Sequence, residues 1–519
     1  MIIVKRAAVF AALFLFFGLP LFAQDVSLTS RDGKVELSGT LLGFDGEFYR
    51  LSTDYGELTV DGSGVSCAGP GCPNLQDFVA EIQMSGSASM GAVLMPALID
   101  AFAQRNGYSV TREEADLTRF AYLLTRLDTG KLAARFGFRA TNTDEGFADL
   151  LADEADIVMA LREIRKEERI NAREAGMGDL TGANRSRVLS LDAVVPIVSL
   201  SNPIKRISPF DLAQVFAGKI TNWQAFGGPD APIDLHLPSD ASGLNQAIVD
   251  QVMTPAKLDL TDAIIRHALP SELAEAVAKD TFALGITSYA ERSNTQVLTL
   301  GGTCGFALDA SRRTIKTEDY PLTAPMFMYF PARRLPLIAR EFLAFTRSPD
   351  AQNVIRRAGF VDQTPEEIAI EDQGNRFANA ITVAGPETSL EELQRMTATL
   401  SPMARLTTSF RFEAGSIRLD AQSRSNVQQL ARALEQGTYD ARQLLFVGFS
   451  DGDGAAKSNR DIALRRAEAV LRAVSAAAVT ANLDRVNLGV DAFGEAMPMA
   501  CDDSDWGRQV NRRVEVWVR

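Results

Sequence analysis

The stretch Phe446–Val470, FVGFSDGDGAAKSNRDIALRRAEAV, contains the local signals of a strand, a turn and a helix in immediate succession. The apolar run Leu444–Val447 predicts a buried strand, and the Gly- and Asp-rich segment Gly448–Gly454 predicts a turn after it. Asp451 lies in that turn, and Arg466 lies fifteen residues further on, in a helix rich in Ala and Arg. These two side chains either clamp a ligand that carries both an ammonium and a carboxylate, or form an ordinary surface ion pair.

The segments around this stretch predict a domain over residues 405–519. The expected elements are a strand that begins at Phe410, a turn at Gly415–Asp420, a helix at Ser423–Leu434, and strands at Val486–Ala492 and Val514–Val518. Helices that cross between strands in this order are typical of an α/β sandwich.

Several short motifs follow one another through this domain. They are Phe412-Glu413-Ala414-Gly415-Ser416, Gly448-Phe449-Ser450-Asp451 with Gly454, Asn459, Arg466-Ala467, Gly494-Glu495-Ala496-Met497-Pro498 and Asn511-Arg512-Arg513-Val514. The ordered set resembles the OmpA-like peptidoglycan-binding family over about 110 residues. The one departure is Ile462-Ala463, where the family has Leu-Ser.

This resemblance implies a role for five residues. Asp451 and Arg466 would hold the ammonium and the carboxylate of the diaminopimelate side chain of peptidoglycan, through charge-assisted hydrogen bonds. Asn459 would organise the loop or donate to the ligand. Arg512 and Arg513 are either structural or line the site. Neither a metal nor a catalytic step is implied.

Length and charge limit the classes of function. At roughly 150 residues per domain, a chain of 519 residues holds two to four domains. The net charge of −13 argues against nucleic acid or an anionic membrane as partner, since both need a basic face. The net charge does not exclude a small anionic ligand, because the local dipoles at a site, and not the charge of the whole chain, decide whether such a ligand binds.

The first residues have the pattern of a secretory signal. Lys5 and Arg6 precede an apolar run from Ala7 to about Leu21, and cleavage after Ala23 would remove residues 1–23. An uncleaved membrane anchor is the alternative, and no later apolar run is long enough to span a bilayer. Together with the resemblance to the OmpA-like family, this export signal implies a periplasmic protein associated with the cell wall or outer membrane.

Four cysteines in an exported chain suggest disulfides. Cys67 and Cys72 lie in the tight loop CAGPGC, which can close on itself. Cys304 and Cys501 then remain as the second pair. Because they fall in different candidate domains, a bridge between them would tie those domains together.

Residues 24–78 predict a small β-rich module. Apolar and polar residues alternate, with turns at Asp32-Gly33, Asp45-Gly46 and Asp61-Gly62. This pattern is typical of a small barrel or a β-meander built from hairpins. The module contains no chemical motif, so we expect it to pack against a neighbour or another protein.

Residues 79–361 alternate between strands and helices. Small hydroxyl residues, Ser85 to Met90, separate a strand from a helix at about Gly91–Gln104, and Thr141–Phe147 forms a second such junction before a helix at Ala148–Ala152. Unpaired N–H groups at the start of a helix suit an oxyanion, although simple capping explains the same residues. Arg162 follows a buried strand and either points into a crevice or belongs to a solvated charged run.

The stretch Leu212–Trp223, LAQVFAGKITNW, contains FxGKIxNW after a strand and an Asn-Pro turn. It resembles the phosphate-binding protein family of ABC transporters, and the resemblance covers about residues 80–360. It implies a type II periplasmic-binding-protein fold with the ligand in a cleft between two lobes. Lobe 1 would comprise about 79–198 and 284–361, and lobe 2 about 199–283. Val194–Leu200 and Ala283–Thr287 would cross between the lobes.

The sequence departs from that family at its anion loops. The family has R-x-D-x-S-G-T where this chain has Pro238 to Leu244, so its Arg and its Thr are replaced, and Arg162 stands near the position of an acidic proton acceptor. These changes leave three readings open: a guanidinium from elsewhere with phosphate still bound, another oxyanion, or a cleft without a ligand. The expected anion-site residues are Ser85, Gly86, Ser87, Ser89, Thr143, Asp144, Arg162, Asp240, Ser242 and Gly243.

Residues 362–404 turn acidic, and we expect a partly helical linker. His236 and His267, the only histidines, have no Cys neighbour at metal spacing, and no Ser/His/Asp grouping suggests catalysis. We therefore expect a non-catalytic protein without cofactor that binds phosphate or a related oxyanion and is held on peptidoglycan. Its further partner would be an ABC transporter membrane complex or an envelope protein. The alternative is a structural envelope protein whose two-lobed domain is an interaction module.

Overall fold

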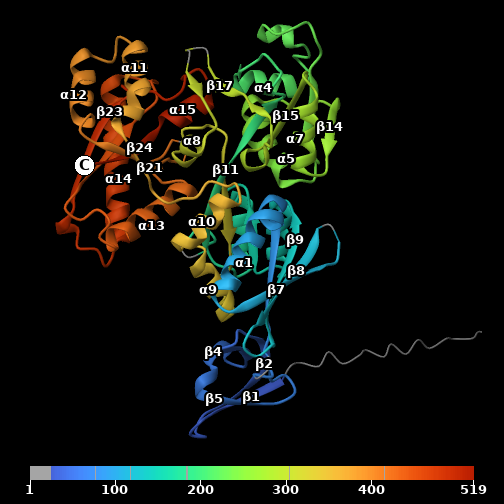
Figure 1. Cartoon of the computed structure of the whole chain (residues 1–519). Coiled ribbons are helices and arrows are strands. Elements are labelled where there is room, and N and C mark those ends of the chain that lie inside the picture. Colours follow the sequence, from blue (N-terminus) through green and yellow to red (C-terminus); the bar gives the residue numbers. More distant parts are fainter. Residues whose placement is uncertain are drawn as a thin grey trace, which may run out of the picture. The chain divides into compact units, whose positions relative to one another are not determined.

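The computed structural model describes residues 25–75, 78–116, 118–182, 185–302, 304, 306–413 and 415–519. The expected signal peptide, residues 1–23, lies outside them. Among these residues, no helix is both long and apolar enough to cross a membrane. The chain divides into two compact units, Met1–Ala80 and Glu81–Arg519 (Figure 1).

The first unit is one antiparallel sheet. Its strands are β1 (Asp25–Ser30), β2 (Glu36–Phe44), β3 (Phe48–Thr53), β4 (Gly56–Asp61) and β5 (Val65–Ala68), in the order β4-β3-β2-β1-β5. Strands β1 to β4 form an antiparallel β-meander, one of the two forms expected, and β5 returns to pair with β1 at the other edge of the sheet. One face buries a small core that includes Tyr49 and Leu51. The predicted disulfide between Cys67 and Cys72 is confirmed and closes the loop after β5. A covalent link of this kind suits a module with so small a core.

In the second unit, one mixed sheet runs through both lobes in the order β14-β13-β15-β11-β19-β10-β6-β9-β8-β7. Its strands are β6 (Ala80–Ser87), β7 (Tyr108–Glu114), β8 (Arg119–Arg126), β9 (Leu132–Thr141), β10 (Ile157–Ala160), β11 (Ser186–Val198), β13 (Asp234–Pro238), β14 (Ile264–His267), β15 (Ala283–Ser288) and β19 (Thr323–Tyr329).

The strand β11 joins the two lobes. Its first half pairs with β19 in lobe 1, and its second half, from Val194, pairs with the returning strand β15 (Figure 1). The last twelve residues of β11 are almost all buried, which matches its position inside the sheet. A short sheet, β12-β17-β18, lies beside lobe 2. In it β17 (Thr299–Gly301) pairs with β12 (Arg206–Ile207) on one side and with β18 (Ala307–Leu308) on the other, whereas we expected β17 and β18 in lobe 1.

Helices cover the lobes. They are η2 (Met90–Leu94) with α1 (Met95–Arg105), α2 (Thr143–Leu151), α3 (Lys166–Glu174), α4 (Pro209–Phe216), α5 (Gly243–Ile248), η4 (Val249–Met253), α6 (Thr254–Ala256), α7 (Pro270–Lys279), α8 (Arg312–Lys316), α9 (Leu337–Phe345) and α10 (Pro349–Arg357). The helix predicted from Ala148 begins five residues earlier. The reason is that the side chain of Asn142 caps it by accepting from the N–H of Glu145.

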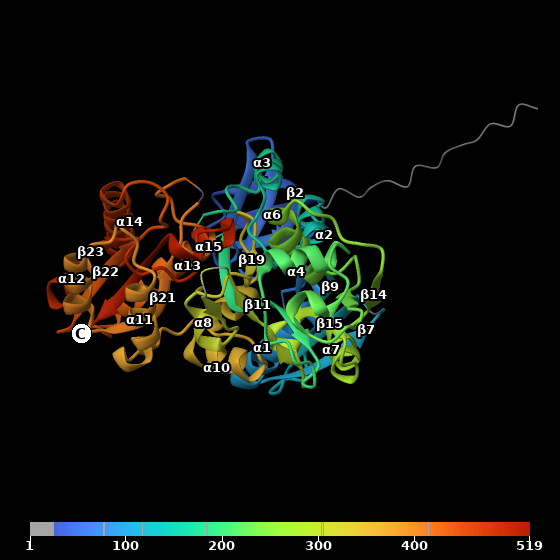
Figure 2. The ribbon, with the colours of Figure 1, turned by 90° about the horizontal axis from the view of Figure 1, so that it is seen from above.

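The C-terminal domain has the expected sheet with helices on both faces (Figure 2). Its strands follow the order β20-β21-β24-β22-β23. They are β20 (Glu367–Ile368), β21 (Ala404–Phe410), β22 (Gln443–Phe449), β23 (Asn487–Gly494) and β24 (Arg513–Val518). The helices are α13 (Ala421–Glu435), α14 (Ala456–Ala477) and the short α15 (Asp505–Asn511).

The segment 362–404, which we expected to be a linker, supplies part of this domain's core. Besides β20 it forms α11 (Gly374–Thr382) and α12 (Leu390–Leu400). Leu393, Met396 and Leu400 pack against Trp517 on the sheet face opposite to α13 and α14. The segment is helical, as predicted, but its apolar stripe makes it one layer of the domain.

Candidate ligand-binding sites

Two of the three expected anion loops are shaped by a glycine contact and by a helix cap, respectively. Gly86 near the end of β6 has a φ of +126°, and a Cβ there would lie 2.1 Å from the carbonyl oxygen of Met159 on β10. Only glycine permits this approach. Ser242 caps α5 by accepting from the N–H of Asn245, so the capping role that we weighed for such residues is present at this loop.

The loops of the two lobes touch each other. A Cβ built on Gly243 would lie 3.6 Å from Cα of Asn142, and 3.7 Å from both Cδ1 of Leu161 and Cα of Ser87. The side-chain amide of Asn142 also donates to the carbonyl oxygen of Ala241 at 3.0 Å. The structure therefore brings the three predicted loops together, in an arrangement in which the lobes are closed against each other.

The hydroxyl groups of the loops differ in what they already bind. Ser85 donates to Asp149 at 2.5 Å, and the hydroxyl of Thr143 accepts from the N–H of Leu161. Ser89 precedes η2 without a capping bond from its side chain. The Oγ of Ser87 is fully buried, and none of the described residues is its hydrogen-bond partner. Ser87 therefore has a donor to offer in the region where an anion was expected.

Arg162 is already neutralised. It pairs with Asp144 and with Glu168, the latter at 2.6 Å, and its guanidinium lies over the ring of Phe147. Burial acts to raise the pKa of Asp144, but the guanidinium groups of Arg162 and Arg165 bring that pKa below its ordinary value. A cation that already faces two carboxylates has little charge left for an anion, so Arg162 is poorly suited to replace the arginine that the family has at position 238.

The structure places a different guanidinium beside the third loop. Arg266 on β14 pairs with Asp240 at 2.6 Å and donates to the carbonyl oxygen of Pro238 at 2.9 Å. It also donates to the side chain of Asn245 in α5 at 2.8 Å. Sequence reasoning missed Arg266, because only the pairing of β14 with β13 brings it to this loop. The one signal available was an arginine in a short apolar run, Ile264–His267.

In the C-terminal domain, the ion-pair partner of Asp451 is Arg512 and not Arg466. Arg466 is 4% exposed, lies over the ring of Phe412 and has no partner for its Nε among the described residues. Burial, and then the nearby charge of Arg512, lower its pKa. Arg512 itself pairs with Asp451 at 3.0 Å. A buried guanidinium short of partners is costly, which points to a carboxylate ligand.

Asn459 and Arg513 have supporting positions. Asn459 donates to Glu495 at 2.6 Å and so links α14 to the loop after β23. Arg513 is fully buried, bonded to Glu515 at 2.7 Å and to the carbonyl oxygen of Met497. Of the two roles that we left open for Arg513, this placement corresponds to the structural one, because its donors face the core and not a ligand.

The C-terminal domain contacts both lobes. Arg424 of α13 pairs with Glu163 of lobe 1 at 2.6 Å, and the indole N–H of Trp506 in α15 donates to the carbonyl oxygen of Gln251 in lobe 2 at 2.8 Å. The predicted disulfide Cys304–Cys501 is confirmed. The buried guanidinium of Arg405 in the C-terminal domain donates to both carboxylate oxygens of Asp319 in the two-lobed domain, at 2.6 and 3.0 Å. Opening of the lobes would therefore have to displace this domain.

The carboxyl group of Glu318 predicts a pH dependence of stability. It lines a cavity of about 230 Å³ between the lobes and the C-terminal domain. Burial and the charge of Asp420, opposed by Arg411, raise its pKa to about 8, above the ordinary value of 4.5. A raised folded-state pKa stabilises at low pH, and this contribution is lost as the pH rises from about 5 to about 8.

We therefore expect the variant Glu318→Gln to lose less stability than the wild type as the pH rises. Between pH 6 and pH 8, the free energy of unfolding of the wild type should fall relative to that of Glu318→Gln, by at most about 1.4 kcal/mol per pH unit. Urea denaturation at both pH values measures this difference. Glu468→Gln on the exposed side of α14 is the control, and parallel pH profiles for wild type and Glu318→Gln would contradict the assignment.

Comparison with known proteins agrees with both domains. Residues 56–350 match the PBP superfamily domain, and residues 411–512 match the OmpA family. The phosphate-binding protein PstS of Bacillus subtilis is 25% identical over 191 residues, which are 36% of this chain and 60% of that protein. Protein SphX of Synechococcus elongatus is 25% identical over 276 residues, 49% of this chain and 77% of that protein.

Among solved structures, an ABC-type phosphate transport receptor from Vibrio cholerae is 20% identical with a TM-score of 0.41, covering 54% of this chain and 99% of that chain. The peptidoglycan-associated lipoprotein of Burkholderia pseudomallei is 25% identical with a TM-score of 0.19, covering 21% of this chain and 89% of that chain. Since the superfamily match spans more than half of the sequence, the chain belongs to the PBP superfamily and carries an OmpA-family domain at its C-terminal end.

Proposed function

We propose that the two-lobed domain binds phosphate or a related oxyanion, and that the C-terminal domain holds the protein non-covalently on peptidoglycan in the periplasm. The observation that carries the first part is the guanidinium of Arg266 on Asp240, beside the loop where the resemblance places an arginine. Ser87, whose Cα lies 3.7 Å from a Cβ built on Gly243, adds a buried hydroxyl without a partner among the described residues. The relatives that are named phosphate-binding proteins support the same ligand.

The second part rests on the C-terminal site. Arg466 is buried with an unpartnered Nε, and Asp451 pairs with Arg512, whose charge also acts on Arg466. A cation of this kind suits a carboxylate, and Asp451 suits an ammonium, so together they match the two charged groups of diaminopimelate. The expected export signal in residues 1–23 would bring the protein to this ligand.

Arg266→Ala tests the anion site. We expect the affinity for phosphate to fall by about tenfold or more, because a hydrogen bond to a charged group contributes about 1.5–3 kcal/mol. Asp240 is 76% exposed at its side chain, so the loss of its partner should cost little stability. Titration calorimetry of the mature protein with inorganic phosphate, and with sulfate for comparison, measures the affinity.

Arg173→Ala serves as the control, since Arg173 is an exposed arginine of α3 that pairs with Asp179. Phosphate binding that persists unchanged in Arg266→Ala would contradict the role of this residue. The absence of heat with either anion for the wild type would contradict oxyanion binding itself.

The second candidate function is an interaction module that binds no solute. Two observations favour it: Arg162 is occupied by Asp144 and Glu168, and the loop at Gly243 lies in direct contact with Asn142 and Ser87. In this case the lobes would serve as a rigid surface for an envelope protein or a membrane complex. The same calorimetric titration separates the two functions.

A further inference from the structure

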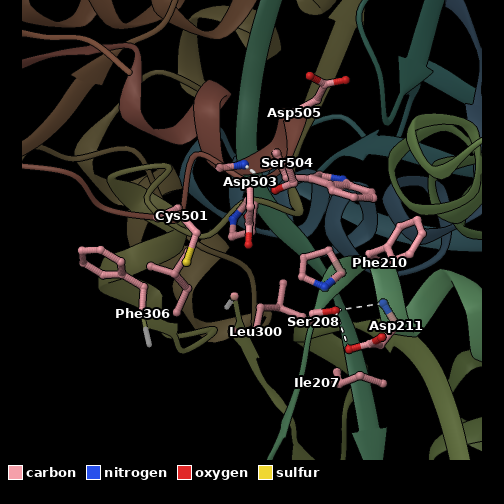
Figure 3. A pocket seen from close by; sticks show the side chains of 18 of the residues that line it. Ile207, Ser208, Phe210, Asp211, Leu300, Phe306, Cys501, Asp503, Ser504 and Asp505 are labelled. Atoms are coloured by element: carbon pink, nitrogen blue, oxygen red, sulfur yellow. Dashed lines mark hydrogen bonds between the residues drawn. The ribbon is translucent and has the colours of Figure 1, made fainter. Parts of the chain in front are cut away.

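A cavity of about 780 Å³ lies between lobe 2 and the C-terminal domain (Figure 3). Lobe 2 contributes the start of α4 with Phe210, and Leu300 and Phe306 around the β17–β18 connection. The C-terminal domain contributes the segment before α15 and the first residues of α15, Ala500 to Arg508 without Asp502. The volume is within the range of sites for small molecules, about 300–1,000 Å³. Neither of the two sites described above includes this cavity.

Two aromatic residues line the cavity from opposite domains, Phe210 and Trp506. Phe210 is 50% exposed, although it lies on the first turn of a helix whose other apolar residues are buried. Ser208 fixes that turn by accepting from the N–H of Asp211 at 2.9 Å, a bond drawn in Figure 3. Opposite, Trp506 is bound through its indole N–H to the carbonyl oxygen of Gln251. An exposed ring at the edge of a cavity provides an apolar face for a ligand.

The charged groups of the cavity argue for a neutral ligand rich in hydroxyl groups. Asp211, Asp503 and Asp505 outnumber Arg206 and Arg508, so an anion is disfavoured. Carboxylates accept hydrogen bonds from hydroxyl groups, and guanidinium groups donate to them. A sugar ring combines an apolar C–H face with hydroxyl groups at its edge, and this combination matches aromatic rings surrounded by acidic and basic side chains.

A hydrogen bond connects the segment that forms one wall of the cavity to the turn that carries Asp451. Asp502 lies between two residues that line the cavity, Cys501 and Asp503, and accepts from the N–H of Gly452 at 2.8 Å. Gly452 directly follows Asp451. Arg508 also lines the cavity and donates to the carbonyl oxygen of Asp502 at 2.8 Å. The turn that carries Asp451 is therefore bonded to the segment that lines the cavity, which brings the two candidate sites near each other.

We propose that this cavity binds a sugar ring of the glycan strand whose stem peptide is held by Asp451 and Arg466. The ligand thus spans two domains: its charged peptide end lies on the C-terminal domain, and its sugar lies against Phe210 of lobe 2. This inference rests on the proposed binding of peptidoglycan. It makes the two-lobed domain part of the wall-binding surface, and it gives the disulfide Cys304–Cys501 the role of holding the two walls of the cavity together.

The test compares two soluble probes on the full mature protein. One is a stem peptide that contains diaminopimelate, and the other is the same peptide attached to an amino-sugar disaccharide. The wild type should bind the disaccharide-peptide about tenfold more tightly. Phe210→Ala should remove this difference and leave the affinity for the peptide unchanged, and Phe210→Leu, which keeps apolar bulk without a ring, should reduce it. Leu269→Ala is the matched control, because Leu269 belongs to the same lobe and is 54% exposed.

The outcomes separate the inference from the function on which it rests. Equal affinities of the wild type for the two probes, or a difference that survives in Phe210→Ala, would overturn the sugar site while the peptide site stands. If the wild type binds neither probe, the proposed wall binding fails and the sugar site fails with it. A preference for the disaccharide-peptide that depends on Phe210 and not on Leu269 supports the inference.

Discussion

Asp319→Ala is expected to lower the free energy of unfolding by about 3–5 kcal/mol, the range for removing one partner of a buried ion pair. Asp319 follows α8 of the two-lobed domain, whereas Arg405 and Arg411 belong to the C-terminal domain. All three side chains are at most 5% exposed. Burial acts to raise the pKa of Asp319, but the charge of Arg405 brings it below its ordinary value, so the carboxylate is charged at neutral pH. Its removal leaves two buried guanidinium groups short of a counter-charge.

Urea denaturation measures this loss, with the C-terminal and two-lobed domains followed separately because a chain of several domains need not unfold in one step. Arg405 keeps Glu515 at 3.3 Å, so the lower end of the range is the more reasonable expectation. Arg472→Ala, which removes an exposed pair with Glu468 on α14, should change stability by less than about 0.5 kcal/mol. A loss below about 1 kcal/mol for Asp319→Ala would show that this buried contact does not hold the domains together.

Arg466→Ala is expected to release the protein from purified peptidoglycan. The loss of charged hydrogen bonds to the ligand carboxylate, at about 1.5–3 kcal/mol each, corresponds to roughly one to two decades in affinity. Asp451→Ala should have an effect of similar size through the ammonium. Because the Nε of Arg466 has no partner among the described residues, the substitution removes a buried charge and few internal bonds. The domain should therefore stay folded.

Co-sedimentation with peptidoglycan, at increasing salt, measures retention on the wall. Arg465→Ala is a close control, since it changes the neighbouring arginine of α14, which is exposed. Circular dichroism of each variant verifies folding. Wild-type retention of both Arg466→Ala and Asp451→Ala would be incompatible with the clamp, whereas equal loss in Arg465→Ala would indicate attraction by general charge.

Much of the fold could be predicted from local patterns. The strand predicted at Leu444–Val447 is the centre of β22, and the strand predicted at Val514–Val518 is β24 with one added residue. The disulfide pairs were also predicted correctly. The segment 362–404 was harder, because its acidic composition conceals the apolar stripe of α12 that packs on Trp517. The sequence alone does not show which surface such an apolar stripe packs against, and here it is the sheet face that carries Trp517.

For the candidate anion site, the positions of the loops could be predicted, but the pairing of the charges could not. The loops at Ser87, Asn142 and Gly243 do come together, as the resemblance implied. However, the charge at Arg162 is cancelled by Asp144 and Glu168, and both the pairing and the burial depend on how α2 and α3 pack. Motif spacing identifies which residue types are present, but it does not show which of them have already satisfied one another.

The sequence by itself determined most strands and helices, which follow from periodicity and turn residues acting over a few residues. The two family resemblances added the order of the domains and the prediction of Asp451 and Arg466 as ligand residues, and the pair Cys304–Cys501 followed by elimination once Cys67 and Cys72 were paired. Only the tertiary structure decided that Arg266 stands beside Asp240, that Arg513 belongs to the core, and that lobe 2 and the C-terminal domain share a cavity. Each of these depends on contacts between segments far apart in the chain, because strand pairing and domain packing, not spacing along the sequence, set which charges and rings meet.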